Sequence, residues 1–502
     1  MSPRPALLVI AVVFAILNAD ITTVNVALVT VGKDLHSDLE DLQWGLNSYM
    51  LAFAALIVAA GRLADVFGRR RCLLVGSLLF AMASLICGIA PTLSVLVIGR
   101  VLQGAGGALM LPAGMAIISA AYSGEERAVA LGTLVGVAGV AQSIGPLVGG
   151  FLTAEISWRC VFLVNLPLIA VIMIVALRGI RESHDQTVSR RLDVAGVTLL
   201  ATALTSLLIG LDLTEGSDSN PQLAVGLIML SLILLGVFTI VERATSNAIV
   251  DGKLLRLRPF LCSCVASCLL GFVFFLFLFI AALYLQEELG YSAFTAGIAL
   301  VPFSLVLAVT GVMAGHLTSR FQLTNLLITS CVSMALGLAA LSFVPASYGY
   351  VGMVFPFLLV AAGAGPGFTL LNTAGLAAVP SERSGQAAGI IYMFRFGGGA
   401  IGVAVASTLH GAFFHSALVA TLSKTPVSAA LQKLLEQPGA VERLRRLESG
   451  LMASQIEQVR LAFHESFVAA FANTLRLNVI LPIAIAVLVI ALMDNKLKMQ
   501  KH

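Results

Sequence analysis

The strongest constraint on this chain is the recurrence of apolar runs that are each long enough to cross a lipid bilayer. A membrane-spanning helix needs ~20 consecutive apolar residues, and about fourteen such runs follow one another along the sequence. Because the bilayer core holds no water that could bind backbone groups, runs of this kind satisfy their hydrogen bonds as helices. The sequence therefore predicts an all-α integral membrane protein. The predicted spans are centred near residues 6–30, 44–61, 72–90, 94–119, 128–153, 160–177, 193–211, 222–241, 260–285, 295–316, 323–344, 351–378, 386–411 and 467–492.

The composition agrees with a lipid environment. Hydrophobic residues make up 59% of the 502 residues, charged residues make up 11%, and the mean hydropathy is +0.99. This leaves too little polar surface to cover a soluble globule of this size. The net charge of +4 is small and gives no indication of nucleic-acid binding. The apolar stretch from Pro5 to Val31 exceeds the ~7–15 residues of a signal-peptide core, so we expect it to remain as the first span.

Basic residues orient the predicted spans. The loops on one side carry the basic residues, whereas the loop from Asp212 to Pro221 on the other side is acidic and holds no Lys or Arg. The positive-inside rule therefore places both termini in the cytoplasm, and we expect the protein to lie in the plasma membrane, as in a bacterial inner membrane. The basic residues after the second, sixth and eighth spans are Arg62, Arg69, Arg70, Arg71, Arg178, Arg181, Arg190, Arg191, Arg243, Lys253, Arg256 and Arg258.

Neither a metal site nor an enzyme active site is expected. All seven cysteines lie in or beside apolar segments, where a reduced thiol behaves as a small hydrophobe. Cys262, Cys264 and Cys268 share one helical run and have no histidine close by, so they do not converge on a metal ion. The seven histidines are scattered mainly at span ends, which disfavours a catalytic cluster. We predict no cofactor and no metal.

The loop after the second span has the character of a gate. The segment Gly61–Arg71 reads GRLADVFGRRR, and its glycines, Gly61 and Gly68, permit a close approach of helices and a sharp turn. Asp65 can form charge-assisted contacts with Arg69 or Arg70 that hold one closed state. The simpler interpretation is that the arginines only set the topology, which requires no particular spacing of the aspartate and the glycines.

Three charged residues lie within apolar spans. Asp20 is costly when charged in such a place, so it is a candidate for binding and releasing a proton. The alternative is that Asp20 caps a break or pairs permanently with a polar neighbour such as Asn25. Arg100 faces the bundle interior or water, and its partner can be Asp20, a substrate or backbone carbonyls. Arg395 is a candidate for the substrate cavity or for pairing.

These segments resemble motifs of the major facilitator superfamily and, within it, of the fourteen-span drug:proton antiporters. The gate loop matches that superfamily's loop motif at Gly61, Asp65, Gly68 and Arg69. The segment 100–107 resembles the motif whose buried arginine, here Arg100, is associated with proton transfer. The motif that marks antiporters is similar to the segment 145–150 of the fifth span, and its matching residues are Gly145, Pro146, Gly149 and Gly150.

Two further segments resemble signatures of that group, but each differs from the usual pattern at one residue. The segment 20–28 resembles its first-helix signature, but Val29 stands where a proline is usual. The segment 158–167 resembles its entry to the sixth span, with Cys160 in place of an aromatic residue. The tenth span, 295–315, has no Asp or Glu, whereas some relatives that export divalent cations carry one, so we do not expect export of dications.

The resemblance implies a complete architecture. Two six-helix halves, residues 1–180 and 259–502, are joined by two inserted spans and linkers in residues 181–258. The resemblance implies that a small-molecule substrate binds between the halves, and we expect protons to drive the export of lipophilic or cationic molecules by alternating access. Candidate residues of the substrate cavity are Asn25, Gln103, Gln142 and Arg395. The alternatives are an exporter of an endogenous metabolite or lipid, and a membrane receptor or scaffold that transports nothing.

One long external segment, residues 412–466, is amphipathic with helical spacing and a Pro438-Gly439 break. We interpret it as a solvated lid or as a helical hairpin on the outer membrane interface. A docking surface for an envelope partner is the alternative.

Overall fold

The computed structural model describes residues 3–35, 39–183, 194–213, 220–244, 252–380, 383–423 and 453–493. These residues form helices and their connections, with no strand among them. Within them, thirteen helices are long and apolar enough to cross a membrane, and one shorter apolar helix covers Ala195–Leu207. The predicted all-α membrane protein is therefore confirmed. The predicted seventh span is the one that corresponds to the shorter helix.

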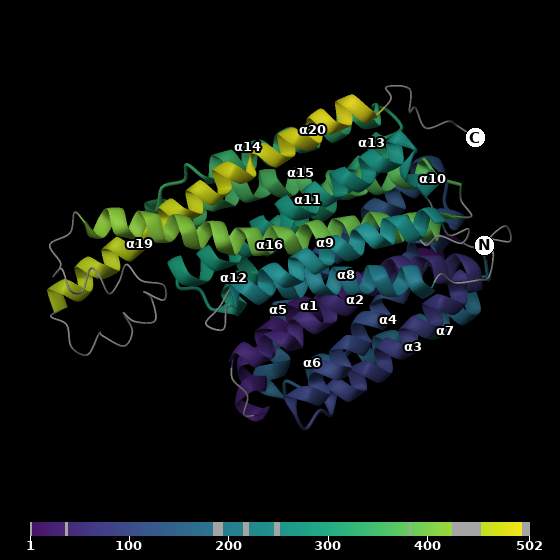
Figure 1. Ribbon diagram of the computed structural model, residues 1–502, viewed down its shortest axis with the longest axis horizontal. Coiled ribbons are helices and arrows are strands. Elements are labelled where there is room, and N and C mark those ends of the chain that lie inside the picture. Colours follow the sequence, from purple (N-terminus) through teal and green to yellow (C-terminus); the bar gives the residue numbers. More distant parts are fainter. Residues whose placement is uncertain are drawn as a thin grey trace.

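The first half of the chain forms one helical bundle, drawn in purple and blue in Figure 1. Its core contains the side chains of Phe14 on the first helix, Tyr49 and Phe53 on the second, and Phe80 on the third. Its helices are α1 (Pro3–Leu35), α2 (Leu39–Phe67), α3 (Arg69–Gly88), α4 (Leu93–Ala121), α5 (Gly124–Glu155), α6 (Cys160–Leu163) and α7 (Asn165–Gly179).

The last part of the chain forms the second bundle, drawn in teal, green and yellow. Aromatic rings fill its core, where Phe277 packs against Phe303 and Phe357 with ring centroids 5.4 Å apart in both pairs. Its elements are α11 (Arg258–Leu283), the π-helix η1 (Tyr284–Glu288), α12 (Ala293–Ala299), α13 (Val301–Leu317), α14 (Leu323–Leu341), the 3₁₀ turn η2 (Ala346–Tyr348), α15 (Gly349–Ala377), α16 (Ser384–Leu422), α19 (Ala453–Asn478) and α20 (Ile480–Leu492).

The segment between the bundles contains a helical hairpin. It consists of α8 (Val194–Asp212) and α9 (Pro221–Ala244), and the short α10 (Gly252–Leu255) leads into the second bundle. In Figure 1 the hairpin crosses the middle of the molecule, and α8 packs against α2 of the first bundle and α16 of the second. The inserted helices therefore lie along one seam between the bundles.

The two bundles meet directly on two sides. On one side α2 packs against α16, and on the other side α5 packs against α13. Small residues bring α5 and α13 close together, since a Cβ atom built on Gly136 would lie 3.1 Å from the Cβ atom of Ala308. Glycine-rich faces thus let the two bundles approach closely along the α5–α13 seam.

The structure describes both ends of the predicted external segment 412–466. α16 continues to Leu422 and α19 begins at Ala453, so both ends of the predicted segment 412–466 are helical. At ~1.5 Å per residue, the 39 residues of α16 extend for about 58 Å, well beyond the ~30 Å of bilayer hydrocarbon. α16 and α19 together project past the other helices at the left of Figure 1. Residues 424–452, including the Pro438-Gly439 break, lie outside the described residues.

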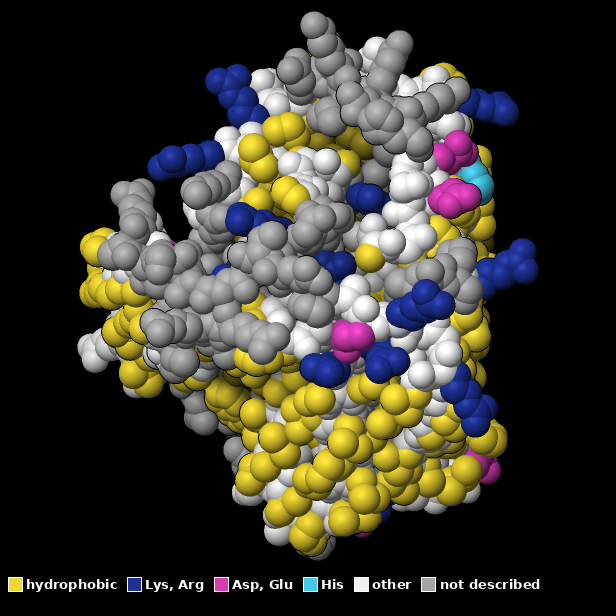
Figure 2. Space-filling view, turned by 90° about the vertical axis from the view of Figure 1, so that its right-hand side faces the viewer, with side chains coloured by type: hydrophobic (Ala, Val, Ile, Leu, Met, Phe, Trp, Pro, Cys, Tyr) yellow, Lys and Arg dark blue, Asp and Glu magenta, His cyan; other side chains and the backbone are white. Residues whose placement is uncertain are grey.

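The surface separates into basic and apolar regions. Figure 2 views the end of the molecule at which α1 begins, where Lys and Arg side chains are scattered over the end face. Large apolar side chains are exposed on the flanks, such as Met82 on α3, Ile174 on α7 and Leu232 on α9. Exposed apolar residues on membrane-spanning helices are the surface that contacts lipid.

Candidate functional site

An ion pair lies buried in the first bundle. Asp20 of α1 is 3% exposed and Arg100 of α4 is completely buried, and Nη1 of Arg100 donates to Oδ2 of Asp20. Of the alternatives that the sequence leaves open, the structure therefore pairs Arg100 with Asp20. Because both charges are buried, their mutual bonding compensates for part of the cost of removing them from water.

The guanidinium group of Arg100 holds two further oxygen atoms. Its Nε donates to the carbonyl oxygen of Gly45 at 2.9 Å, and its Nη1 lies 2.8 Å from Oε1 of Gln103. Gln103 in turn donates from Nε2 to Oγ of Ser84 at 2.7 Å. The ring centroid of Tyr49 lies 4.4 Å from the guanidinium carbon, which places the cation over an aromatic face. Arg100 thus joins α1, α2 and α4, and Gln103 extends the network to α3.

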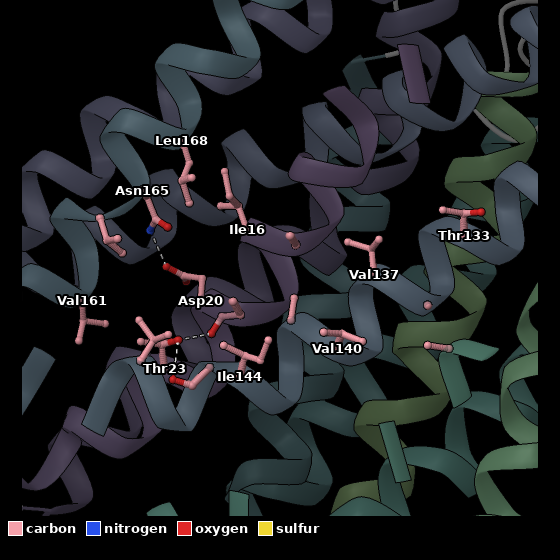
Figure 3. Close-up of a pocket in the computed structure, with 18 of the residues that line it drawn as sticks. Ile16, Asp20, Thr23, Thr133, Val137, Val140, Ile144, Val161, Asn165 and Leu168 are labelled. Atoms are coloured by element: carbon pink, nitrogen blue, oxygen red, sulfur yellow. Dashed lines mark hydrogen bonds between the residues drawn. The ribbon is translucent and has the colours of Figure 1, made fainter. Parts of the chain in front are cut away.

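Asp20 also has a partner on α7. Nδ2 of Asn165 donates to its Oδ1 at 3.0 Å, and Figure 3 shows this bond together with the neighbouring Thr23. Asn165 is placed by the turn before it, where Trp158 and Arg159 both donate to Oδ2 of Asp34 at the end of α1, at 3.1 and 2.7 Å. The segment 158–167 therefore fixes the start of α7 against α1 and delivers an amide to the buried carboxylate.

The predicted antiporter motif packs α5 against the same part of α1. Oγ1 of Thr23 lies 2.7 Å from the carbonyl oxygen of Ala19 and 3.2 Å from that of Gly145. A Cβ atom on Gly149 would lie 2.7 Å from the carbonyl oxygen of Thr23, so only glycine fits there without a shift. These glycines hold the backbone that carries Asp20 close to α5.

The other two residues of this motif differ in their contacts. Pro146 faces the second bundle, where a Cβ atom on Gly297 of α12 would lie 2.8 Å from the proline Cβ. Gly150 is half-buried. The motif therefore contacts both α1 and the opposite bundle.

The predicted gate joins the two bundles at the end of α2. Asp65 accepts from Nη2 of Arg69 at 3.2 Å and from the backbone N–H groups of Gly385 at 3.2 Å and Gln386 at 2.7 Å. The two amides belong to the first turn of α16, where unpaired N–H groups and the helix dipole favour an anion. The contact is tight, because a Cβ atom on Gly61 would lie 2.5 Å from the carbonyl oxygen of Gly385.

A residue that sequence reasoning missed caps the helix after this gate. Glu182, in the segment after α7, accepts from the backbone N–H groups of Arg70 at 3.0 Å and Arg71 at 3.1 Å. Nη1 of Arg70 donates to the carbonyl oxygen of Ile180 at 3.1 Å. Gly68 has φ of +112°, a backbone conformation that permits the sharp turn between α2 and α3. The end of α7 is thereby fastened to the start of α3.

A second buried cation lies in the other bundle. Arg395 of α16 is 6% exposed, and its Nη2 donates to Oδ1 of Asn372 at 3.0 Å. Its guanidinium carbon lies 4.5 Å from the ring centroid of Phe368 and 4.6 Å from that of Tyr392. No carboxylate among the described residues forms an ion pair with it.

The predicted cavity residues are not gathered at one place. Gln103 belongs to the Arg100 network, Arg395 lies in the other bundle, and Gln142 is half-buried on α5. The side chain of Asn25 is not among those that the structure describes. Sequence reasoning assigned no role to Tyr49, Ser84 or Asn165. Only Asn165 carried a signal, as the asparagine of the segment 158–167.

The described residues contain no group of three or more His, Cys, Asp or Glu side chains that could hold a metal ion. The arrangement offers ion-pair and hydrogen-bond chemistry inside the membrane, together with an interlocked contact between two bundles.

A family model described as Major Facilitator Superfamily matches residues 8–403. The multidrug resistance protein Stp of Mycobacterium tuberculosis is 32% identical over 403 residues, which cover 80% of this chain and 74% of Stp. The lincomycin resistance protein of Streptomyces lincolnensis is 32% identical over 405 residues, covering 80% of this chain and 82% of that protein. The cephamycin export protein CmcT of Amycolatopsis lactamdurans is 33% identical over 397 residues, covering 78% and 82%.

Solved structures show the same fold. The proton:xylose symporter XylE aligns over 98% of this chain and 96% of its own, with a TM-score of 0.61 and 13% sequence identity. At that identity the likeness concerns the fold alone.

Proposed function

Because this chain belongs to the major facilitator superfamily, we propose that it is a proton-coupled antiporter that exports lipophilic or cationic small molecules by alternating access. Relatives named for multidrug resistance, lincomycin resistance and cephamycin export support the substrate class. The observation that carries the proposal is the buried pair of Asp20 and Arg100, formed between two membrane helices.

The pair responds to a proton in a defined way. Protonation of Asp20 removes its negative charge and with it the ion pair to Arg100, while the bonds from Arg100 to Gly45 and Gln103 remain. The attachment of α1 to α4 and α7 therefore depends on the protonation state of one carboxyl group. A cationic substrate that requires the ionised carboxylate competes with the proton for Asp20. This competition couples the movement of the proton across the membrane to the movement of the substrate in the opposite direction.

The gate supplies the second element of the mechanism. Asp65 binds the first turn of α16 across the seam, which holds the bundles together at the end where α1 begins. Opening of that end requires both backbone bonds to break. We assign this end to the cytoplasm, so the described state is closed toward the cytoplasm.

The available driving force is sufficient for useful export. Exchange of one proton for a monocation moves no net charge and is driven by the pH difference alone. Exchange of one proton for a neutral molecule moves one elementary charge, which supplies about 2.3 kcal/mol across ~100 mV. At ~1.4 kcal/mol per tenfold change, this sustains a substrate gradient of roughly fiftyfold.

The test uses purified protein in liposomes with an imposed pH difference. We expect wild type to drive accumulation of lipophilic cations, and we expect Asp20→Asn to fold but to lose the accumulation that follows the pH difference. The amide keeps the size of the carboxyl group and still accepts from Asn165. Transport by Asp20→Asn that follows the pH difference as in wild type would reject the assigned role of Asp20.

A further inference from the structure

A cavity of about 830 Å³ lies between α1, α5, α7 and α13. This volume is within the roughly 300–1,000 Å³ of sites that hold drug-sized ligands. Figure 3 shows its wall along α5, where Thr133, Val137, Val140 and Ile144 follow one another on one face of the helix. The cavity touches both bundles, because α13 belongs to the second one.

The mouth of this cavity opens toward the bilayer. Side chains that line it are large, apolar and exposed, including Val309 at 56%, Met313 at 52% and Ile144 at 44%. They lie within helices that are long and apolar enough to span the membrane, so the exposed rim contacts lipid and not water. A molecule that is dissolved in the bilayer therefore reaches the cavity without passing through an aqueous funnel.

The lining is apolar except at a few positions, and three of these lie together. Asp20, Thr23 and Asn165 form one end, where Figure 3 shows Asp20 directed at Asn165. Thr23 and Gly145 are in contact, so this end is level with Gly145 of α5. From there to Thr133 the helix rises through twelve residues, or about 18 Å, comparable with the ~15 Å of one leaflet.

We infer that this cavity is a lateral binding site for a drug-sized lipophilic cation, which enters from the bilayer and places its charge beside Asp20. The inference rests on the proposed function and specifies its substrate class and route. Apolar walls suit the body of such a molecule, and the carboxylate is the charge complementary to it.

The charge balance supports an exchange at this site. With Asp20 protonated, the pair with Arg100 carries one positive charge. With Asp20 ionised and a monovalent cation bound, the three groups together also carry one positive charge. Replacement of a proton by a monocation therefore leaves the net charge buried in the bundle unchanged, which avoids the cost of burying an additional charge. A dication would add one charge.

The first experiment maps the site on wild-type protein in nanodiscs, without any gradient. A triphenylphosphonium that carries a benzophenone is photolysed, and the adducts are located by peptide mass spectrometry. We expect adducts on residues 133–148 and 308–313 that excess tetraphenylphosphonium suppresses. Adducts confined to the surroundings of Arg395, or adducts suppressed by phospholipid and not by tetraphenylphosphonium, would overturn the inference. Because no transport is measured, failure of the antiport proposal does not affect this result.

The second experiment fills the cavity. Ala141 of α5 lines it and is half-buried, so the graded series Ala141→Val, Ala141→Phe and Ala141→Trp narrows the space in steps. We expect the half-saturating concentration of tetraphenylphosphonium to rise with side-chain size, by at least tenfold for the largest variant that folds. The matched control is Ile174→Trp, on a lipid-facing position of α7 that does not line the cavity.

The outcomes separate the two proposals. An unchanged half-saturating concentration in the Ala141 series, or an equal rise in Ile174→Trp, would contradict the lateral site and would leave the proposal of pH-driven export unaffected. Loss of labelling in Ala141→Trp together with an absence of pH-driven export in wild type would keep the site and reject antiport.

Discussion

Arg100 acts through its geometry as well as its charge. Its Nε faces the carbonyl oxygen of Gly45, and its Nη1 is shared between Asp20 and Gln103. A planar guanidinium group presents these donors in fixed directions, whereas an ammonium group is a point charge on a flexible stem. The pairing of α1 with α2 and α4 therefore requires arginine.

We predict that Arg100→Lys retains the positive charge but lowers pH-driven transport at least tenfold, because arginine donates to the three oxygens from two separate nitrogens and lysine has only one. Efflux from proteoliposomes measures the rate, and Arg178→Lys on the exposed end of α7 is the control. A rate close to wild type in Arg100→Lys would show that charge alone suffices.

Arg395 presents the opposite case, a buried cation that forms no ion pair with a described carboxylate. We predict that Arg395→Gln leaves the thermal stability of the purified protein unchanged or raises it, because glutamine can still donate to Asn372 and no charge remains buried. Melting in detergent provides the measurement, with Asn372→Ala as a comparison that removes the acceptor. A loss of more than about 2 kcal/mol on Arg395→Gln would instead indicate a counter-charge that binds Arg395.

Which residues carry charge inside the membrane can be predicted from sequence, because such residues are rare there. Which of them meet cannot be predicted, since Asp20 and Arg100 are 80 positions apart and their contact depends on how α1 packs on α4. The same limit hid Tyr49 and Ser84, whose types are ordinary in apolar helices. The same holds for Arg395, because the sequence identifies it as a charge within a span but gives no signal for its partner Asn372.

At the scale of elements, the α2–α16 contact is a close junction between the two bundles. Gly61 faces the backbone of Gly385 without a side chain between them, and Asp65 binds the adjacent amides. A substitution at Gly61 can therefore disturb this junction without changing a charged residue.

We predict that Gly61→Ala shifts the protein away from the state closed at this end, because its Cβ atom would lie 2.5 Å from a carbonyl oxygen and overpacking costs about 1–3 kcal/mol. Reactivity of a cysteine placed near this end toward a membrane-impermeant maleimide should rise severalfold. Gly226→Ala on α9, where a Cβ atom meets nothing within 4 Å, is the matched control. Equal reactivity in both variants would contradict the gating role of this junction.

Hydropathy predicts most helices here, because each must match the thickness of the bilayer. Hydropathy does not show where a helix ends beyond its apolar run, so the bounds of α16 and α19 come from the structure. It also misses the split of the sixth predicted span into α6 and α7, which comes from a local turn at Val164. Glu182 caps α3 from more than 100 positions away, beyond the reach of any local capping rule.

At the scale of the whole molecule, the two bundles touch along two seams and the α8–α9 hairpin follows one of them. Helix α8 of the hairpin packs on α2 and α16, which also carry the predicted gate. The other seam, between α5 and α13, adjoins the lateral cavity. Any tilting of the bundles thus changes both the gate and the cavity.

The start of α1 and the end of α20 lie at the same end of the molecule in Figure 1. We predict that this end is cytoplasmic, because the basic residues of the predicted inner loops require it. Green fluorescent protein fused to either end should fluoresce in a bacterial host, and alkaline phosphatase fused there should be inactive. A fusion within 214–219 should show the reverse behaviour, and activity of the phosphatase at either end of the chain would contradict the orientation.

The length of α16 gives the molecule a lever. Its first turn is fastened at the gate, and about 28 Å of its 39 residues extends past the bilayer. A rotation of about 15° about that fastened turn, as large as known rigid-body rotations of subunits, would move the far end of the helix, about 58 Å away, through about 15 Å. A pair of dyes, one at the far end of α16 and one on the opposite bundle, would therefore report at a distance whether the α2–α16 junction is closed.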